Sequence, residues 1–196
     1  KGKKTPYEIE IFAPIMEKLQ QLAKIEDIQS RRIVAEHLRS SMMIIADGGI
    51  PSNTDRGYIL RRLIRRMTRH LNKLQIDLNE LSNLINLNID VLKNMYPELE
   101  QNREKIAQIL VAEKDKFMKT LVNGEREFEK VIHRLQNENK TVVDGSIMFK
   151  LYETYGFPPE ITSDLAKEQG FTVDSKEFDK LFKEHQEKSR LGSEQK

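Results

Sequence analysis

The chain has 196 residues, of which 38% are hydrophobic and 33% charged, and its formal net charge is +2. This composition is typical of a soluble, helix-rich protein with one elongated or two small domains. It contains no cysteine, which excludes disulfides, thiolate metal sites and a cysteine nucleophile. No apolar run approaches the roughly 20 residues of a membrane span, and there is no secretory signal. The first residue is Lys rather than Met, so we expect a piece of a longer, cytoplasmic protein.

Apolar residues at i, i+3, i+4 spacing predict four helices in the first half of the chain. Their apolar stripes cover residues 11–22, 34–45, 60–74 and 78–95, and we expect the first helix to start at Tyr7. Asp27 or Ser30 is placed to cap the second helix. Asp47-Gly48-Gly49 should end it, because glycine is the usual residue of a left-handed C-cap.

Residues 98–139 contain no proline and a single glycine, Gly124. They form either one long helix or two helices that break near Gly124, and their mixed charge indicates a solvated packing helix. A polar loop follows, and three shorter helices are then predicted from Gly, Pro and Asp-x-x-Glu signals. Their approximate ranges are 145–155, 159–170 and 175–190.

The expected fold class is therefore all-α, an irregular helix array with one long helix or helix pair and a small C-terminal helical subdomain. We divide it into an N-terminal part with a basic helix, a long connecting helix or helix pair, a C-terminal helical part and a disordered tail. These parts cover residues 1–97, 98–140, 141–190 and 191–196.

The helix expected over residues 60–74 is unusually basic. No acidic residue occurs between Arg56 and Lys73, and like charges at i, i+4 spacing repel, so helix stability does not explain them. The planar guanidinium group suits phosphate, which makes RNA or DNA the expected partner. Alternatively, some of these arginines pair with acidic residues of the long helix. The residues predicted to contact a nucleic-acid backbone are Arg56, Arg61, Arg62, Arg65, Arg66 and Arg69.

Two blocks of sequence resemble the alanyl-tRNA synthetase family. The first block comprises the segments RIVAEHLR (32–39), IADG (45–48), PSN (51–53) and RGYILRR (56–62), and the second is FKLYETYGFP (149–158). The blocks come in the family's order, and the resemblance covers about Tyr7 to Arg190. It implies the mostly helical tRNA-recognition region that follows the class II catalytic core and reads the G·U wobble pair in the acceptor stem of tRNA(Ala).

The resemblance also implies the base-reading residues. A-form RNA exposes a wide, shallow minor groove, where the exocyclic amino group of a wobble guanine has no pairing partner. An amide offers it an acceptor beside a donor, and a carboxylate offers acceptors only. The family's Asn falls on Asn53, and its Asp falls on Glu153, which keeps the charge but adds a methylene; we expect Glu153 to retain the role. From the residues alone, Asn53 is a turn residue or helix N-cap, and Glu153 is a solvated carboxylate.

The resemblance places a catalytic core that uses ATP with magnesium upstream, and a zinc-binding editing domain downstream. Neither motif set is present, so we expect no catalytic residue, metal ligand or cofactor here, and no formation of alanyl-adenylate. The expected partners are the tRNA(Ala) acceptor stem and the catalytic and editing domains of the parent chain, without a membrane. Two alternatives stay open: a sequence-indifferent helical RNA- or DNA-binding module, and a helical protein-interaction module built on residues 98–139.

Overall fold

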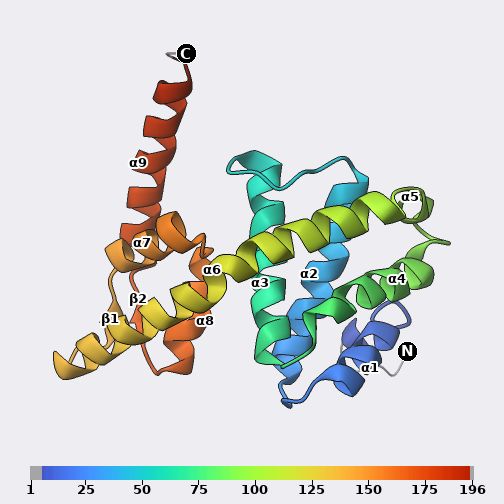
Figure 1. Ribbon diagram of the computed structural model, residues 1–196, viewed down its shortest axis with the longest axis horizontal. Coiled ribbons are helices and arrows are strands. Elements are labelled where there is room, and N and C mark those ends of the chain that lie inside the picture. Colours follow the sequence, from blue (N-terminus) through green and yellow to red (C-terminus); the bar gives the residue numbers. More distant parts are fainter. Residues whose placement is uncertain (1–5, 195–196) are drawn as a thin grey trace. The chain divides into compact units, whose positions relative to one another are not determined.

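The computed structural model describes residues 6–194, and helices make up nearly all of their regular structure (Figure 1). The mostly helical fold class predicted from the sequence is confirmed. The chain divides into two compact units, an N-terminal unit up to Met118 and a C-terminal unit from Lys119. The division falls inside residues 98–140, so the long helix of that stretch contributes residues to both units.

The N-terminal unit is built from helices alone among the residues described. Its first α-helix starts at Ala13 rather than at Tyr7, which lies in a separate turn of 3₁₀ helix, since Pro14 lacks a backbone N–H and fits only the first turn of an α-helix. In chain order the elements are η1 (Pro6–Glu8), α1 (Ala13–Leu22), α2 (Ile28–Ala46), α3 (Asp55–Lys73), η2 (Leu78–Glu80), α4 (Leu81–Leu92), α5 (Pro97–Gln101) and the first part of α6 (Arg103–Asn137).

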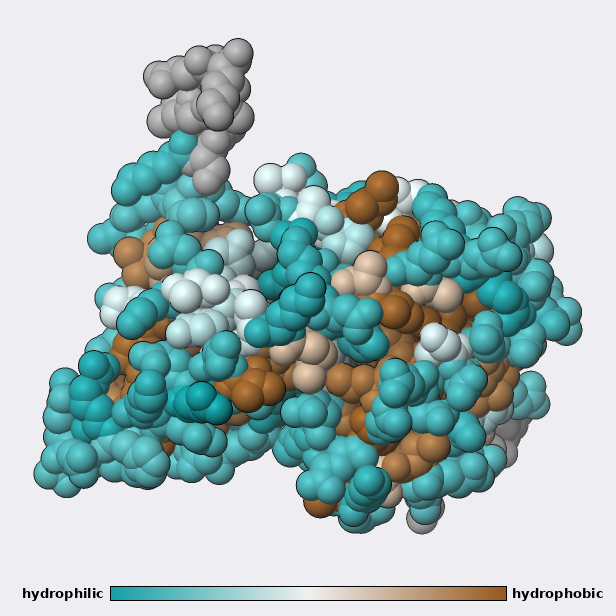
Figure 2. Space-filling model, in the orientation of Figure 1, coloured by the Kyte–Doolittle hydropathy of each residue, from teal (hydrophilic) through white to brown (hydrophobic). Residues whose placement is uncertain are grey.

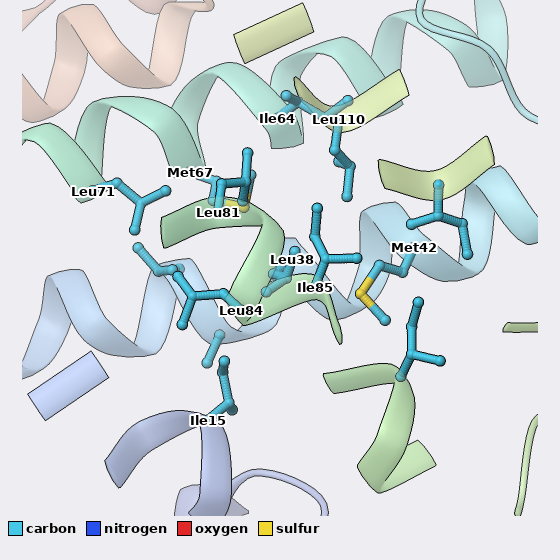
Figure 3. Close-up of a cluster of buried hydrophobic side chains, with 14 of the residues drawn as sticks. Ile15, Leu38, Met42, Ile64, Met67, Leu71, Leu81, Leu84, Ile85 and Leu110 are labelled. Atoms are coloured by element: carbon cyan, nitrogen blue, oxygen red, sulfur yellow. The ribbon is translucent and has the colours of Figure 1, made fainter. Parts of the chain in front are cut away.

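The core of this unit lies where α1, α2, α3, α4 and α6 converge (Figure 3). The apolar stripes predicted from the sequence face this core, except that Met95, the last residue of the fourth stripe, is 56% exposed and lies beyond the end of α4 at Leu92. Helices α2 and α3 pack against each other along their lengths. Leu63, which the stripe of α3 included, is only half-buried. The labelled side chains, each at most 1% exposed, are Ile15, Leu38, Met42, Ile64, Met67, Leu71, Leu81, Leu84, Ile85 and Leu110.

Asp27 caps α2 and also ties it to the end of α3. Its carboxylate accepts from the backbone N–H of Ser30 at 2.9 Å and from the Ser30 hydroxyl at 2.8 Å. The Nζ atom of Lys73, the last residue of α3, lies 3.0 Å from the same carboxylate. Burial raises the pKa of Asp27, but the hydrogen bonds from Ser30 and Lys73 outweigh burial and hold this pKa well below its usual value.

This cap makes stability depend on acid pH. Because the pKa of Asp27 is lower in the folded than in the unfolded chain, the carboxylate contributes its full stabilisation above about pH 4 and loses it as the pH falls toward the folded-state pKa. Asparagine still caps a helix, so we expect Asp27→Asn to lower the free energy of unfolding at pH 7 by about 1–2 kcal/mol through the lost charge, which strengthens the hydrogen bonds from Ser30 and Lys73. Urea unfolding at pH 7 and pH 3 measures this: the difference between the two chains should shrink at pH 3, and a difference independent of pH would contradict the assignment.

The long stretch forms the short helix α5 followed by one helix, α6, that continues through Gly124. The sequence alone permits either one continuous helix or a break near Gly124. A Cβ atom added at Gly124 would lie 2.5 Å from Cε1 of Phe157, and Thr120, one turn earlier, donates to the carbonyl oxygen of Tyr155 at 2.9 Å. Gly124 therefore marks a close approach of the segment after α7, and not a helix break.

The C-terminal unit adds a two-stranded parallel sheet in segments between the predicted helices, where no strand is predicted. Two-residue strands carry no periodicity to detect. The strands pair Val142 with Thr172 and Val143 with Val173. Each strand precedes a helix, so α7 and α9 start from the same sheet edge and pack together. The elements are β1 (Val142–Val143), α7 (Gly145–Tyr155), α8 (Pro159–Glu168), β2 (Thr172–Val173) and α9 (Ser175–Glu194).

The end of the chain differs from the predicted tail of residues 191–196. Helix α9 starts at the predicted cap, where Asp174 accepts from the backbone N–H of Glu177 at 3.1 Å, and it extends to Glu194 rather than ending at Arg190. The sequence allows this extension, because α9 contains no proline and its one glycine, Gly192, costs the helix only about 1 kcal/mol relative to alanine. Residues 195–196 lie outside the described part of the chain.

Candidate nucleic-acid interface

The loop between α2 and α3 folds back onto the first turn of α3. The backbone N–H of Ser52 donates to the carbonyl oxygen of Gly57 at 3.0 Å, and the Ser52 hydroxyl donates to the carbonyl oxygen of Thr54 at 2.9 Å. A Cβ atom at Gly57 would lie 2.2 Å from the Ser52 hydroxyl oxygen and 2.4 Å from the carbonyl oxygen of Ile50. Only glycine permits this approach, which holds the intervening Asn53 on the surface.

Asn53 does not cap α3. The N-cap residue is Thr54, which makes no side-chain cap hydrogen bond. The side-chain carbonyl of Asn53 instead accepts a hydrogen bond from the Nη1 atom of Arg61, two turns along α3. The N-cap interpretation of Asn53 is thus replaced by a side-chain contact that keeps its amide at the exposed surface.

Two of the predicted arginines meet a buried carboxylate on α6. Glu113 is 6% exposed, and its Oε1 atom accepts from Nε of Arg65 at 2.7 Å. Nε of Arg61 lies 3.4 Å from the same oxygen. The guanidinium of Arg65 also lies over the ring of Phe117, 5.3 Å from its centroid, which is a cation–π arrangement. The alternative that some arginines pair with acids of the long helix is therefore confirmed for Arg61 and Arg65.

The six arginines predicted to contact a nucleic-acid backbone divide by exposure. Arg65 and Arg69 are buried, at 9% and 4% exposed, which indicates that they stabilise the packing of α3. The side chain of Arg56 is 69% exposed, and its Nη2 atom lies 3.8 Å from the carboxylate of Asp47. Arg61, Arg62 and Arg66 are half-buried, and the guanidinium of Arg62 lies 5.4 Å from the ring centroid of Tyr58. Contact of these arginines with RNA stays a prediction.

Glu153 lies on the last turn of α7, in the C-terminal unit, whereas Asn53 belongs to the N-terminal unit. Its side chain is 58% exposed, and its Oε1 atom lies 3.9 Å from Nδ1 of His185 on α9. A carboxylate near a helix C-terminus interacts unfavourably with the helix dipole. Helix stability therefore does not explain an acidic residue at this position.

His185 belongs to an aromatic cluster that fixes α9 beside this carboxylate. Its ring meets Phe149 edge-on at 5.5 Å between centroids. Tyr152, the neighbour of Glu153 in α7, makes a similar contact with Phe182 at 5.2 Å. Rings at these distances in edge-to-face geometry attract one another beyond their burial. The side of α7 next to Glu153 is thus held by packing rather than by polar contacts alone.

Hydrophilic side chains cover most of the face drawn in Figure 2, interrupted by apolar ones. Two of the exposed apolar residues, Ile50 at 64% and Ile59 at 51%, flank the loop that carries Asn53. No helix between residues 6 and 194 is both long and apolar enough to cross a membrane. Within the same residues, no group of three His, Asp or Glu side chains is placed to hold a metal ion.

Comparison with known proteins assigns the family. The family model for tRNA synthetases class II (A) matches residues 1–196, the whole chain. The chain belongs to this family. It is 40% identical over 201 residues to the alanine–tRNA ligase of Borrelia hermsii (strain HS1 / DAH), and 42% identical over 202 residues to that of Treponema pallidum (strain Nichols). Each of these alignments covers 98% of this chain and 33% of the relative.

A third alanine–tRNA ligase, from Natranaerobius thermophilus, is 39% identical over 196 residues, which cover 96% of this chain and 22% of the relative. This chain of a class II tRNA synthetase thus spans about a third or less of the length of the curated relatives it matches. The family resemblance noted in the two sequence blocks is confirmed, and the chain is a segment of an aminoacyl-tRNA synthetase.

Glu113 of this synthetase segment is not among the site residues predicted from the sequence, although a signal for it is present. The buried stripe of α6 includes Leu110 and Phe117, and Glu113 occupies the stripe position between them. A carboxylate where the period requires an apolar residue indicates a buried charge that needs a partner. The contact between Glu153 and His185 had no such signal, because it depends on how α7 and α9 pack.

Proposed function

We infer that this chain is the part of an alanine–tRNA ligase that selects tRNA(Ala) by the G·U wobble pair of the acceptor stem. The observation that carries the inference is the exposed Asn53 amide, on a loop tied to α3 by Ser52, Gly57 and Arg61. The chain's relatives are alanine–tRNA ligases, and the two sequence blocks that resemble this family contain Asn53 and Glu153.

The proposed recognition is direct readout in the RNA minor groove. The amino group of a wobble guanine is a donor without a pairing partner there, and the side-chain oxygen of Asn53 supplies an acceptor. The exposed carboxylate of Glu153 supplies a second acceptor, and its charge strengthens the hydrogen bond. In a Watson–Crick G·C pair the same amino group donates to the cytosine. It is then less available to Asn53 and Glu153, and this difference would distinguish the two pairs.

Arginines on the surface would position the RNA without reading its sequence. We assign phosphate contacts to Arg56, Arg62 and Arg66, because Arg65 and Arg69 are buried. Three such contacts would give a slope of log affinity against log salt of about −2 to −3. Alanine activation by ATP with magnesium, and any zinc-dependent editing, are proposed for other parts of the parent ligase.

The test is a binding titration of two acceptor-stem hairpins that differ only in G·U versus G·C, at two salt concentrations. We expect the chain to prefer G·U, and we expect Asn53→Ala to remove the preference, worth about 1–3 kcal/mol for a good base contact. Asn72→Ala, at an exposed position near the other end of α3, is the matched control and should bind as the unmutated chain does. Equal binding of both hairpins, weakened only by salt, would indicate instead a sequence-indifferent RNA-binding module.

Glu153→Gln separates the charge of this residue from its shape. The amide keeps an acceptor but loses the charge-assisted hydrogen bond, so the G·U preference should fall, while affinity for the G·C hairpin should rise slightly through reduced phosphate repulsion. Glu187→Gln, exposed on α9, is the charge-matched control. The same titration measures the result. An unchanged ratio of the two affinities would remove Glu153 from the proposed reading site.

A further inference from the structure

A buried carboxylate on α6 is joined to the exposed amide of Asn53 by a single guanidinium group. Nε of Arg61 lies 3.4 Å from Oε1 of Glu113, and Nη1 of the same group donates to Oδ1 of Asn53. Its Nη2 atom lies 3.5 Å from the carbonyl oxygen of Pro51 in the same loop. All these residues belong to the N-terminal unit, so the chain of contacts lies within one compact unit.

Arg61 determines which way the Asn53 amide faces. A guanidinium group carries five N–H donors and no acceptor, so it can face only the oxygen of the amide and not its nitrogen. The Nδ2 group of Asn53 and the second lone pair of Oδ1 then remain for an external partner. In the flipped orientation, the NH₂ group would meet the donating amino group of a wobble guanine, and two donors would oppose each other.

Glu113 in turn restrains Arg61. An arginine side chain has about 2 kcal/mol of rotamer entropy to lose when it is ordered, and an exposed ion pair seldom holds it. Glu113 is different, because it is 6% exposed and Arg65 fixes it with a second guanidinium at 2.7 Å. A buried carboxylate must keep its partners, since leaving it unpaired is costly. Glu113 on α6 thereby restrains Arg61, and Arg61 restrains the side chain of Asn53 in the loop.

We propose that Glu113 and Arg61 are positioning residues for base selection, which hold the Asn53 amide in the orientation that accepts from a guanine amino group. The proposal rests on the proposed function and adds the means by which the reading side chain is oriented before RNA arrives. A group held in its bound orientation loses less freedom on binding. The effect should therefore appear in discrimination between G·U and G·C, beyond any effect on general affinity.

Glu113→Gln in the 196-residue chain tests the proposal, because glutamine keeps the shape and an acceptor but removes the charge that holds both arginines. With the same two hairpins, we expect the preference for G·U over G·C to fall to about twofold or less, from the roughly fivefold or more expected of a base contact. Asp115→Asn on the same helix, whose carboxylate is 59% exposed and pairs with Lys114, should keep the full preference. Each variant is measured well below its own unfolding midpoint.

Two readouts separate positioning from mere stabilisation. In a double-mutant cycle, Glu113→Gln should cost no further discrimination once Asn53 is alanine. In ¹⁵N–¹H spectra without RNA, the side-chain amide resonances of Asn53 should move in Glu113→Gln and stay in place in Asp115→Asn. Equal weakening of both hairpins with unmoved Asn53 resonances would show a structural role only and overturn the proposal.

The outcomes also separate this proposal from the function on which it rests. If the unmutated chain binds G·U and G·C hairpins equally, the proposed function fails and the positioning role fails with it. If the unmutated chain prefers G·U, Asn53→Ala loses the preference and Glu113→Gln retains it, the function stands and only the positioning role is overturned.

Discussion

Phe157→Ala is expected to lower the free energy of unfolding of the C-terminal unit by about 3–5 kcal/mol. The Phe157 side chain is fully buried, and its ring occupies the space beside α6 that Gly124 leaves open. Removing the ring loses its apolar burial and leaves a cavity that two helices cannot readily close. Hydrogen exchange read separately for each unit measures the effect. A loss of less than about 1 kcal/mol would contradict this packing.

Gly124→Ala supplies the complementary test of the same contact. Alanine favours a helix over glycine by about 1 kcal/mol, yet a Cβ atom at this position would lie 2.5 Å from the Phe157 ring. We expect destabilisation by about 1–3 kcal/mol from overpacking. In a Phe157→Leu background, which lacks the outer ring atoms, the same change should become neutral or stabilising. Stabilisation in both backgrounds would show that the close approach does not constrain residue 124.

Arg65→Met is expected to destabilise the N-terminal unit by about 3 kcal/mol, because it leaves the carboxylate of Glu113 buried without its nearest partner. Nε and Nη2 of Arg65 each lie 2.7 Å from Oε1 of Glu113. Arg61 remains at 3.4 Å, which places the effect at the lower end of the usual range for a broken buried pair. Urea unfolding of the unmutated and variant chains measures it.

Replacing both partners should restore much of the loss. Arg65→Met combined with Glu113→Leu removes the unpaired charge, and buried ion pairs exchanged for apolar residues are often close to neutral. The double variant should therefore be more stable than Arg65→Met alone. If the two changes simply add, the pair does not act as a unit, and the burial of these side chains has another cause.

The sequence predicted those features whose signal is local. The apolar stripes of α2 and α3 marked the core, and Asp27 and Asp174 marked two helix starts, because periodicity and caps depend on residues within one or two turns. Pro14 was likewise a local signal for the start of α1, but the apolar residues before it favoured an earlier start. The fold class followed from these elements.

Features that depend on tertiary contacts were not predictable in this way. Gly124 could mark a helix break or a close approach, and only the position of Phe157 decides between them. The six arginines looked equivalent along the sequence, yet Arg65 is buried and paired with Glu113, whereas Arg56 is exposed. In the candidate site, Asn53 was identified by family resemblance, whereas its contact with Arg61 became visible only when the loop folded back onto α3.

The central claim is that Asn53 reads the exocyclic amino group of the wobble guanine. The most direct test removes that one amino group from the RNA. A hairpin with an inosine·U pair keeps the wobble geometry of G·U but lacks the exocyclic amino group in the minor groove. Titrated beside the G·U hairpin at one salt concentration, it should bind the chain as weakly as the G·C hairpin, and Asn53→Ala should bind all three alike. If the inosine·U and G·U hairpins bind the unmutated chain equally, the amino group is not what this domain reads, and the account of Asn53 is contradicted.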